Sequence, residues 1–205
     1  MDLNILMWIH ENLHSNNVIN QIWKHITMTC DVACIWVVLC CVLFNFKKTR
    51  KISIIMALSM GVNCLIVEVG LKNIFMRTRP FTLEPEFANF LNTIGYEPPM
   101  SSSFPSGHAS TSIAVAMTLF LYNKKWGTPS VILAVLIALS RAFLCVHFPT
   151  DILYGLIIGI LVAHIVYFYA NKIMNKIEEK FTGEKKIYPM LYSKTERDIK
   201  NNFWW

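Results

Sequence analysis

The sequence is poor in charged residues and lacks the surface that a nucleic-acid-binding protein needs. Only 16% of its 205 residues are Asp, Glu, Lys or Arg, against roughly 25% in soluble domains. The net charge of +6 comes from lysines and arginines that stand between apolar runs and form no groove or stacking surface. No internal repeat or low-complexity segment is present. These absences exclude a repeat protein and a nucleic-acid-binding module.

The six cysteines lack the spacing that would give them a chemical role. No pair of them has zinc-ligand spacing, and the chain is not a small secreted scaffold. All six fall in or beside apolar runs, so we expect buried free thiols. No cleavable signal peptide is expected either, because the first apolar stretch, Leu3–Ile9, is short and has no basic flank.

Long apolar runs are what the sequence does contain. Hydrophobic residues make up 54% of the chain, and several runs reach or approach the ~20 residues that a bilayer-spanning helix needs. We therefore expect a single all-α domain over residues 1–205, an integral membrane bundle of five to six transmembrane or membrane-associated helices. The clearest runs are Asp31–Phe46, Ile52–Phe75, Ala109–Tyr122, Pro129–Val146 and Ile152–Ala170. The first crossing is expected to begin before Asp31, near Val18–Trp23.

Three segments flank these runs. Residues 1–17 carry apolar side chains at helical spacing, which predicts an amphipathic helix in the headgroup region or a helix packed under the bundle. Residues 76–106 are rich in proline and are expected to form an ordered cap or a mobile lid. Residues 171–205 form a charged tail, expected to extend the last crossing as a helix.

The basic residues predict an orientation. Most lysines and arginines lie at residues 47–51, at residues 124–125 and in the tail 171–205. The positive-inside rule places these segments in the cytoplasm. With five crossings, the loop 76–106 and the turn 147–150 then lie on the extracytoplasmic face of a multi-pass cell-membrane protein.

Three polar clusters stand at ends of the apolar runs, where charge is costly and usually functional. They are Lys72 followed by Arg79-Pro80, then Pro105-Ser106-Gly107-His108, then Ser140-Arg141 followed by His147 and Asp151. Lys72, Arg79 and Arg141 supply positive charge, and guanidinium groups bind two oxygens of one anion. Ser106 and Gly107 precede an apolar helix, whose first N–H groups form an anion site; Ser106 is equally suited to cap that helix. The clusters predict one phosphate-binding site.

Two histidines of these clusters suit complementary roles in phosphoryl transfer. His147 lies four residues before Asp151, whose carboxylate can accept the Nδ1 proton and leave Nε2 as a nucleophile. His108 is not followed by a carboxylate at this spacing and is expected to protonate the leaving oxygen. The other histidines, His10, His14, His25 and His164, are expected to be interfacial or packing residues.

In order and spacing, the three clusters resemble the signature of the type-2 phosphatidic acid phosphatase family. The resemblance covers Lys72 to Asp151 and extends to the flanking crossings by topology. It implies a metal-independent membrane lipid phosphatase that works through a phosphohistidine intermediate. Carried over to this sequence, it gives His147, Asp151 and His108 as nucleophile, orienting partner and general acid. The phosphate cradle that it implies is Lys72, Arg79, Ser106, Gly107 and Arg141.

The expected function is hydrolysis of a lipid phosphate or diphosphate taken from the outer leaflet, with no cofactor and no metal. An undecaprenyl-type diphosphate is favoured, and phosphatidylglycerophosphate or phosphatidate is the alternative. A transporter or channel for phosphorylated compounds is the rival of another class, but binding alone needs no oriented histidine. The roles of two further residues stay open: Glu68 either holds or neutralises Lys72, or serves packing, and Arg77 either contacts a headgroup or faces water. Gly155 and Gly159 are expected to permit close helix contact.

Overall fold

The computed structural model describes residues 1–29 and 33–182 as helices and connecting loops, with no strand among them. The all-α prediction is confirmed. The chain divides into two units, Met1–Ala170 and Asn171–Trp205, and the first holds every residue of the predicted site. The second contributes the described end of the last helix; the rest of the predicted tail lies outside the described residues.

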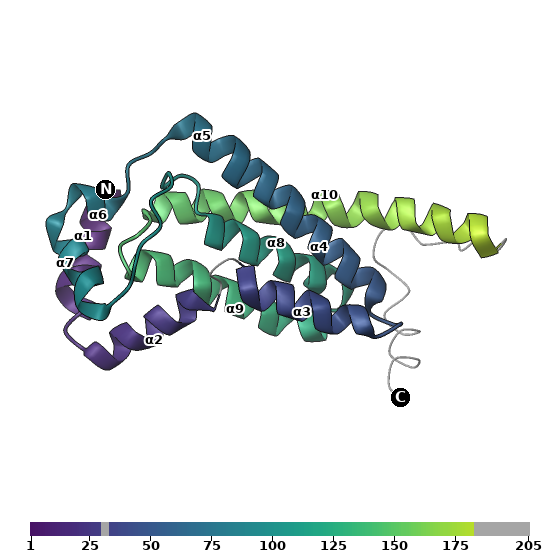
Figure 1. Ribbon diagram of the computed structural model, residues 1–205, viewed down its shortest axis with the longest axis horizontal. Helices are drawn as coiled ribbons and strands as arrows, with labels where there is room; N and C mark the ends of the chain where they lie inside the picture. Colours follow the sequence, from purple (N-terminus) through teal and green to yellow (C-terminus); the bar gives the residue numbers. More distant parts are fainter. Residues whose placement is uncertain (30–32, 183–205) are drawn as a thin grey trace. The chain divides into compact units, whose positions relative to one another are not determined.

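The helices follow one another with short connections, apart from the stretch before α8 (Figure 1). In chain order they are α1 (Asp2–Leu13), α2 (Asn17–Met28), α3 (Cys34–Asn45), α4 (Arg50–Cys64), the π-helix η2 (Leu65–Leu71), α5 (Lys72–Phe75), α6 (Pro80–Leu83), α7 (Pro85–Ile94), α8 (Gly107–Tyr122), α9 (Lys124–Phe143) and α10 (Pro149–Thr182).

Three segments of the described chain are long and apolar enough to cross a membrane. They are Arg50–Leu83, Lys124–Phe143 and Pro149–Ile177, and α3 is a shorter apolar helix. The predicted run Ala109–Tyr122 became α8, whose 16 residues are mostly buried. The helix is rich in small and hydroxyl side chains because it packs inside the bundle, where Trp36 Nε1 donates to Ser112 Oγ over 3.0 Å.

The prediction of the first crossing, from near Val18–Trp23 to Phe46, is wrong in one respect. The structure forms two separate helices there, α2 and α3, and not one continuous helix. α2 ends at Met28, and α3 begins at Cys34 after Ala33 in the left-handed conformation. The polar residues of α2 account for the difference: Lys24 Nζ donates to the carbonyl of Ile94, over 2.8 Å. α2 therefore packs on α7 instead of continuing α3.

The proline-rich loop 76–106 forms a cap that contains the helices α6 and α7. Pro85 starts α7 at a position that needs no N–H donor, and Gly95 ends it with a φ of 65°. The apolar face of α7 packs on the end of α9, in a buried cluster that includes Phe90, Ile94 and Phe143. The sequence did not predict α7.

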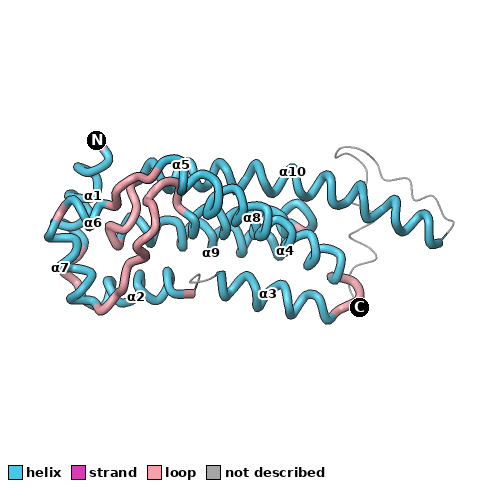
Figure 2. The backbone as a smooth tube through the Cα atoms, turned by 45° about the horizontal axis from the view of Figure 1, so that its top comes forward, coloured by secondary structure: helices cyan, strands magenta, loops and turns pink. Residues whose placement is uncertain are grey.

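The N-terminal helix packs under this cap. Leu6 is fully buried in a cluster with Phe87, Cys145 and Phe148. In Figure 2 α1, α6 and α7 lie at one end of the first unit, where most of the loops also gather. The α3–α4 and α8–α9 turns lie at the opposite end (Figure 1).

Two glycines of α10 let it approach α8 closely, as predicted. A Cβ atom on Gly155 would lie 2.8 Å from the carbonyl oxygen of Ser106, and one on Gly159 would lie 2.3 Å from that of Ser110. Atoms at these distances collide. This contact seats the start of α8 directly against the first turns of α10.

We expect Gly159→Ala to destabilise the protein by about 1–3 kcal/mol, the usual cost of overpacking. Gly61→Ala is the matched control, because Gly61 also lies in a helix but has nothing within 4 Å of an added Cβ. Thermal unfolding in detergent measures both. Equal melting temperatures for the two variants would contradict the close α8–α10 contact.

Candidate active site

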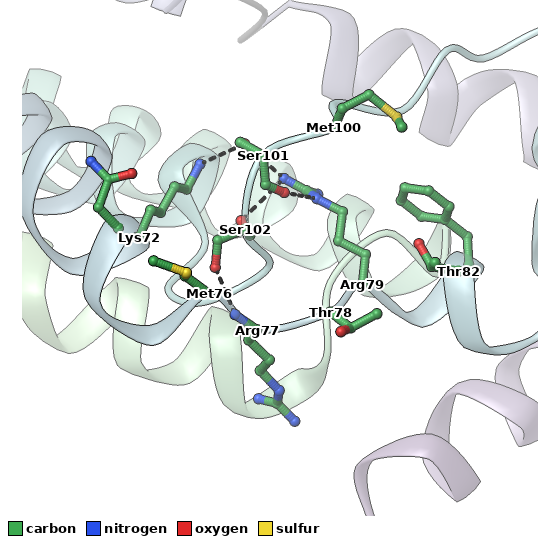
Figure 3. Close-up of a pocket in the computed structure, with 11 residues that line it drawn as sticks. Lys72, Met76, Arg77, Thr78, Arg79, Thr82, Met100, Ser101 and Ser102 are labelled. Atoms are coloured by element: carbon green, nitrogen blue, oxygen red, sulfur yellow. Dashed lines mark hydrogen bonds between the residues drawn. The ribbon is translucent and has the colours of Figure 1, made fainter.

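The predicted cationic residues come from different segments and are all buried. Lys72 begins α5, Arg79 precedes α6, and Arg141 lies in the last turn of α9. Their exposed fractions are 7%, 4% and 0%. In Figure 3 Lys72 and Arg79 both point toward Ser101. The structure therefore keeps two cations beside one short loop.

The guanidinium of Arg79 is held mainly by backbone carbonyls. Its Nε donates to the carbonyl of Ser101 over 2.6 Å, and Nη1 donates to that of Val146 over 3.1 Å. The side chain of Lys72 is held more loosely on this side, with Nζ 3.4 Å from Ser101 Oγ. Neither contact neutralises the positive charges.

Arg141 is the most informative of the cations. Its Nη1 donates to Thr27 Oγ1 over 2.5 Å and to the hydroxyl of Tyr96 over 2.8 Å. Its Nε and Nη2 are buried and have no hydrogen-bond partner in the described part of the chain. Buried unpartnered donors are costly, and more so on a charged group. An oxyanion is the ligand that would satisfy two adjacent guanidinium N–H groups.

A tight turn after α9 brings His147 back over Arg141. Cys145 adopts the left-handed conformation with φ 53°, which is uncommon for a residue with a Cβ atom. The N–H groups of Val146 and His147 then donate to the carbonyl of Arg141, over 3.1 and 3.3 Å. The turn fixes the two predicted site residues to each other through main-chain bonds.

The imidazole of His147 is held in one tautomer. Nδ1 lies 2.7 Å from the carbonyl oxygen of Ser103, which can only accept, so Nδ1 carries the proton. Nε2 lies 3.3 Å from Nη1 of Arg79, which can only donate, so Nε2 holds a lone pair. Burial lowers the pKa of His147 to about 3, the nearby Asp151 opposes this shift, and Arg79 and Arg141 add to it. The ring is neutral at physiological pH.

Asp151 was expected to accept the Nδ1 proton of His147 directly, but its carboxylate lies too far away for a hydrogen bond. Its Oδ2 is 3.7 Å from His147 Nδ1, so the Ser103 carbonyl is the nearer acceptor. That Oδ2 accepts hydrogen bonds from Ser103 Oγ over 2.5 Å and from the Phe148 N–H over 3.0 Å. Asp151 thus positions the loop residue whose carbonyl fixes the tautomer.

Arg77 is a member of this network that the sequence left open. Its Nη1 donates to Asp151 Oδ1 over 2.5 Å, and its Nη2 donates to Asp2 Oδ2 over 3.0 Å. The guanidinium lies over the ring of Phe148, 4.1 Å from the ring centroid. Figure 3 shows Arg77 pointing away from Lys72 and Arg79. It neutralises Asp151 and does not join the anion cradle.

The second predicted cluster lies at the start of α8. Ser106 caps the helix, with Oγ 3.5 Å from the Ala109 N–H, and its own N–H donates to the carbonyl of Asp151 over 3.0 Å. Gly107 is the first residue of α8, and His108, the second, is partly exposed. The capping role of Ser106 is therefore present, and it anchors α8 to α10.

A cavity of about 430 Å³ opens beside the cations, lined by Lys72, Arg77, Arg79, Ser101 and neighbouring residues. No group of three or more His, Cys, Asp or Glu residues in the described chain is arranged to hold a metal ion. The residues brought together here are donors and cations, and their chemistry is that of an anion site with a neutral, oriented imidazole.

Comparison with known proteins gives a family match over the part of the chain that holds these residues. The model of the PAP2 superfamily matches residues 48–175. The undecaprenyl-diphosphatase of Sulfolobus acidocaldarius is 37% identical over 128 residues, which cover 61% of this chain and 58% of that protein. The undecaprenyl-diphosphatase BcrC of Bacillus subtilis is 27% identical over 177 residues, which cover 83% and 85%.

A solved structure is also similar. The transmembrane PAP2-type phosphatidylglycerolphosphate phosphatase from Bacillus subtilis matches with a TM-score of 0.62 and 26% identity, over 84% of this chain and 85% of that one. This chain thus spans little more than half of the S. acidocaldarius relative, but most of the two Bacillus proteins.

Proposed function

This chain belongs to the PAP2 superfamily, and from that premise we propose that it hydrolyses a polyprenyl diphosphate, of the undecaprenyl type, to the monophosphate and inorganic phosphate. It is a membrane protein, and in this proposal it acts as a lipid phosphatase. The proposal rests on two observations: buried N–H donors on Arg141 that have no partner among the described residues, and a neutral His147 whose Nε2 lone pair faces Arg79. The names of the two diphosphatase relatives supply the choice of substrate.

In this proposal the terminal phosphate binds between Lys72, Arg79, Arg141 and the start of α8. Its oxygens take the free donors of Arg141 and draw Arg79 away from His147. The lone pair of Nε2 is then exposed, and the proton stays on Nδ1, which continues to donate to the Ser103 carbonyl. Substrate binding itself thus activates the nucleophile.

The reaction follows in two displacements. Nε2 of His147 attacks the terminal phosphorus, the bond from phosphorus to the bridging oxygen breaks, and His108 protonates that oxygen as the lipid monophosphate leaves. His108 then takes a proton from water, which attacks the phosphohistidine. The P–N bond breaks and returns the electron pair to Nε2, releasing inorganic phosphate.

The site faces the extracytoplasmic side in this proposal. The basic segments 47–51 and 124–125 lie at the end of the bundle opposite the site (Figure 1), and basic loops favour the cytoplasm. The lipid then reaches the cavity beside Lys72 and Arg79 from the outer leaflet, with its chain remaining in the bilayer.

Phosphatidylglycerophosphate is a second candidate substrate, favoured by the similarity to the B. subtilis phosphatase of that lipid. The two candidates differ in the bond that breaks, which is an anhydride in the diphosphate and an ester in the glycerophosphate lipid. An ester oxygen is the poorer leaving group and depends more on protonation by the general acid.

Hydrolysis by the purified protein in excess EDTA tests the function. We expect release of inorganic phosphate from undecaprenyl diphosphate at a higher kcat/KM than from phosphatidylglycerophosphate or phosphatidate. Chelation should leave the rate unchanged, because cationic side chains take the place of Mg²⁺. A rate lost in EDTA and restored by Mg²⁺ would contradict the mechanism. Binding of all three lipids without turnover would favour the transporter.

A further inference from the structure

A carboxylate occupies one side of the proposed phosphate cradle. Glu68 Oε2 lies 2.7 Å from Lys72 Nζ, in an ion pair across one helical turn. The other oxygen, Oε1, reaches across to the next helix: a Cβ atom on Gly107 would lie 2.1 Å from it and 3.4 Å from Lys72 Nζ. The absence of a side chain at Gly107 thus leaves the space that the Glu68 carboxylate occupies.

The backbone around Glu68 departs from the α-helix. Glu68 lies within the π-helix η2, where the N–H of Lys72 bonds back to the carbonyl of Val67. Such wide turns are rare in proteins overall, but where they occur they are often at functional sites. Here the turn lies directly before Lys72, so it sets the face of the helix on which both Glu68 and Lys72 stand.

The carboxylate of Glu68 occupies a place that is suited to a bound anion. The first N–H groups of a helix attract negative charge, and Lys72 supplies a full positive charge next to them. A bound phosphate would use both. A carboxylate that already contacts Lys72 and lies against Gly107 opposes the phosphate by charge and by volume.

A purely stabilising ion pair between Glu68 and Lys72 does not explain why the carboxylate also lies against Gly107 of α8. A pair between residues four apart on one helix needs no contact with a second helix, and it is worth little in general. The side chain of Glu68 is 41% exposed, whereas that of Lys72 is 8% exposed. The carboxylate therefore has room to leave, and the lysine does not.

We propose that Glu68 is an intramolecular competitor for the substrate phosphate. Its carboxylate neutralises Lys72 at the start of α8 while the site is empty, moves out when phosphate binds, and returns when inorganic phosphate leaves. The inference rests on the proposed function only in taking phosphate as the ligand. Its consequence is a cradle that captures a lipid phosphate and still releases the product.

Glu68→Gln tests this, because glutamine keeps the size and the hydrogen bond to Lys72 but removes the charge. We expect inorganic phosphate to bind roughly 10-fold more tightly, a modest gain because a partly exposed charge is screened by water. Product inhibition of lipid hydrolysis should strengthen by the same factor. Glu86→Gln, an exposed carboxylate of α7, is the matched control and should change neither.

Calorimetric titration of the purified protein with inorganic phosphate gives the affinity without any lipid substrate. Unchanged or weaker binding in Glu68→Gln would overturn the proposal; weaker binding would assign Glu68 to holding Lys72 in place. If no lipid phosphate is hydrolysed by the wild type while Glu68→Gln still tightens phosphate binding, the proposed function fails and the competitor role stands. If the wild type is active but the variant has unaltered phosphate affinity, the competitor role fails and the proposed function stands.

Discussion

Replacing His147 by alanine should abolish hydrolysis, lowering kcat by roughly 10⁴-fold or more, as loss of a catalytic nucleophile does. The phosphohistidine should disappear with it. The reason lies in the geometry: Nδ1 donates to the Ser103 carbonyl and Nε2 holds the lone pair, so this ring is set to attack. His147 is buried in the turn after α9, and alanine leaves that turn's main-chain bonds intact.

Rapid quenching with substrate labelled in the terminal phosphate decides the assignment. Wild type should form an acid-labile phosphoenzyme and the His147 variant none. His108→Ala should still form it from a diphosphate, whose leaving group needs little protonation, and should lose most activity on an ester substrate. His164→Ala, an exposed histidine on α10, is the control. Label on His108, Ser106 or Ser140 would show that the roles are wrongly assigned.

Arg141→Lys should lower kcat/KM by roughly 10²–10³-fold, the range found on removing a preorganised transition-state donor. A lysine keeps the charge but loses the two adjacent N–H groups that have no partner among the described residues. Those donors are buried, and Thr27 and Tyr96 hold the same guanidinium through its Nη1, so the donors are aimed before the substrate arrives. The main effect should fall on kcat.

Tyr96→Phe is the matched control for Arg141→Lys. It removes the hydroxyl that accepts from Nη1 but keeps the guanidinium, so we expect a much smaller loss of activity. Thermal unfolding of both variants measures the structural part of each effect. If Tyr96→Phe lost as much activity as Arg141→Lys, Arg141 would have a packing role and not a phosphate-binding one.

The sequence predicted the helical membrane bundle because apolar runs of sufficient length have few alternatives in a bilayer. It also predicted that Lys72, Arg79, Arg141 and His147 belong to one site, and the structure brings them to one end of the first unit. Motif order was enough for this, since each cluster stands at the end of an apolar run. The topology then carries them to the same side.

Other features escaped the sequence because tertiary contacts decide them. α7 forms within a proline-rich stretch because its apolar face packs on the end of α9. α2 and α3 are separate because polar side chains of α2 bind the cap. The roles of Arg77 and Ser103 were missed because their contacts with Asp151 join residues far apart in the chain. Neither belongs to the family signature.

The acceptor for the His147 proton is a main-chain oxygen, and this affects how the site tolerates mutation. A side-chain acceptor is removed by one substitution, whereas the carbonyl of Ser103 persists whatever residue occupies that position. Losing it requires a change in the path of the chain, by insertion, deletion or a shift of the cap. The position of this acceptor depends on the length and shape of the loop and not on the side chain at position 103. Comparison of residue identities among relatives would therefore not reveal it.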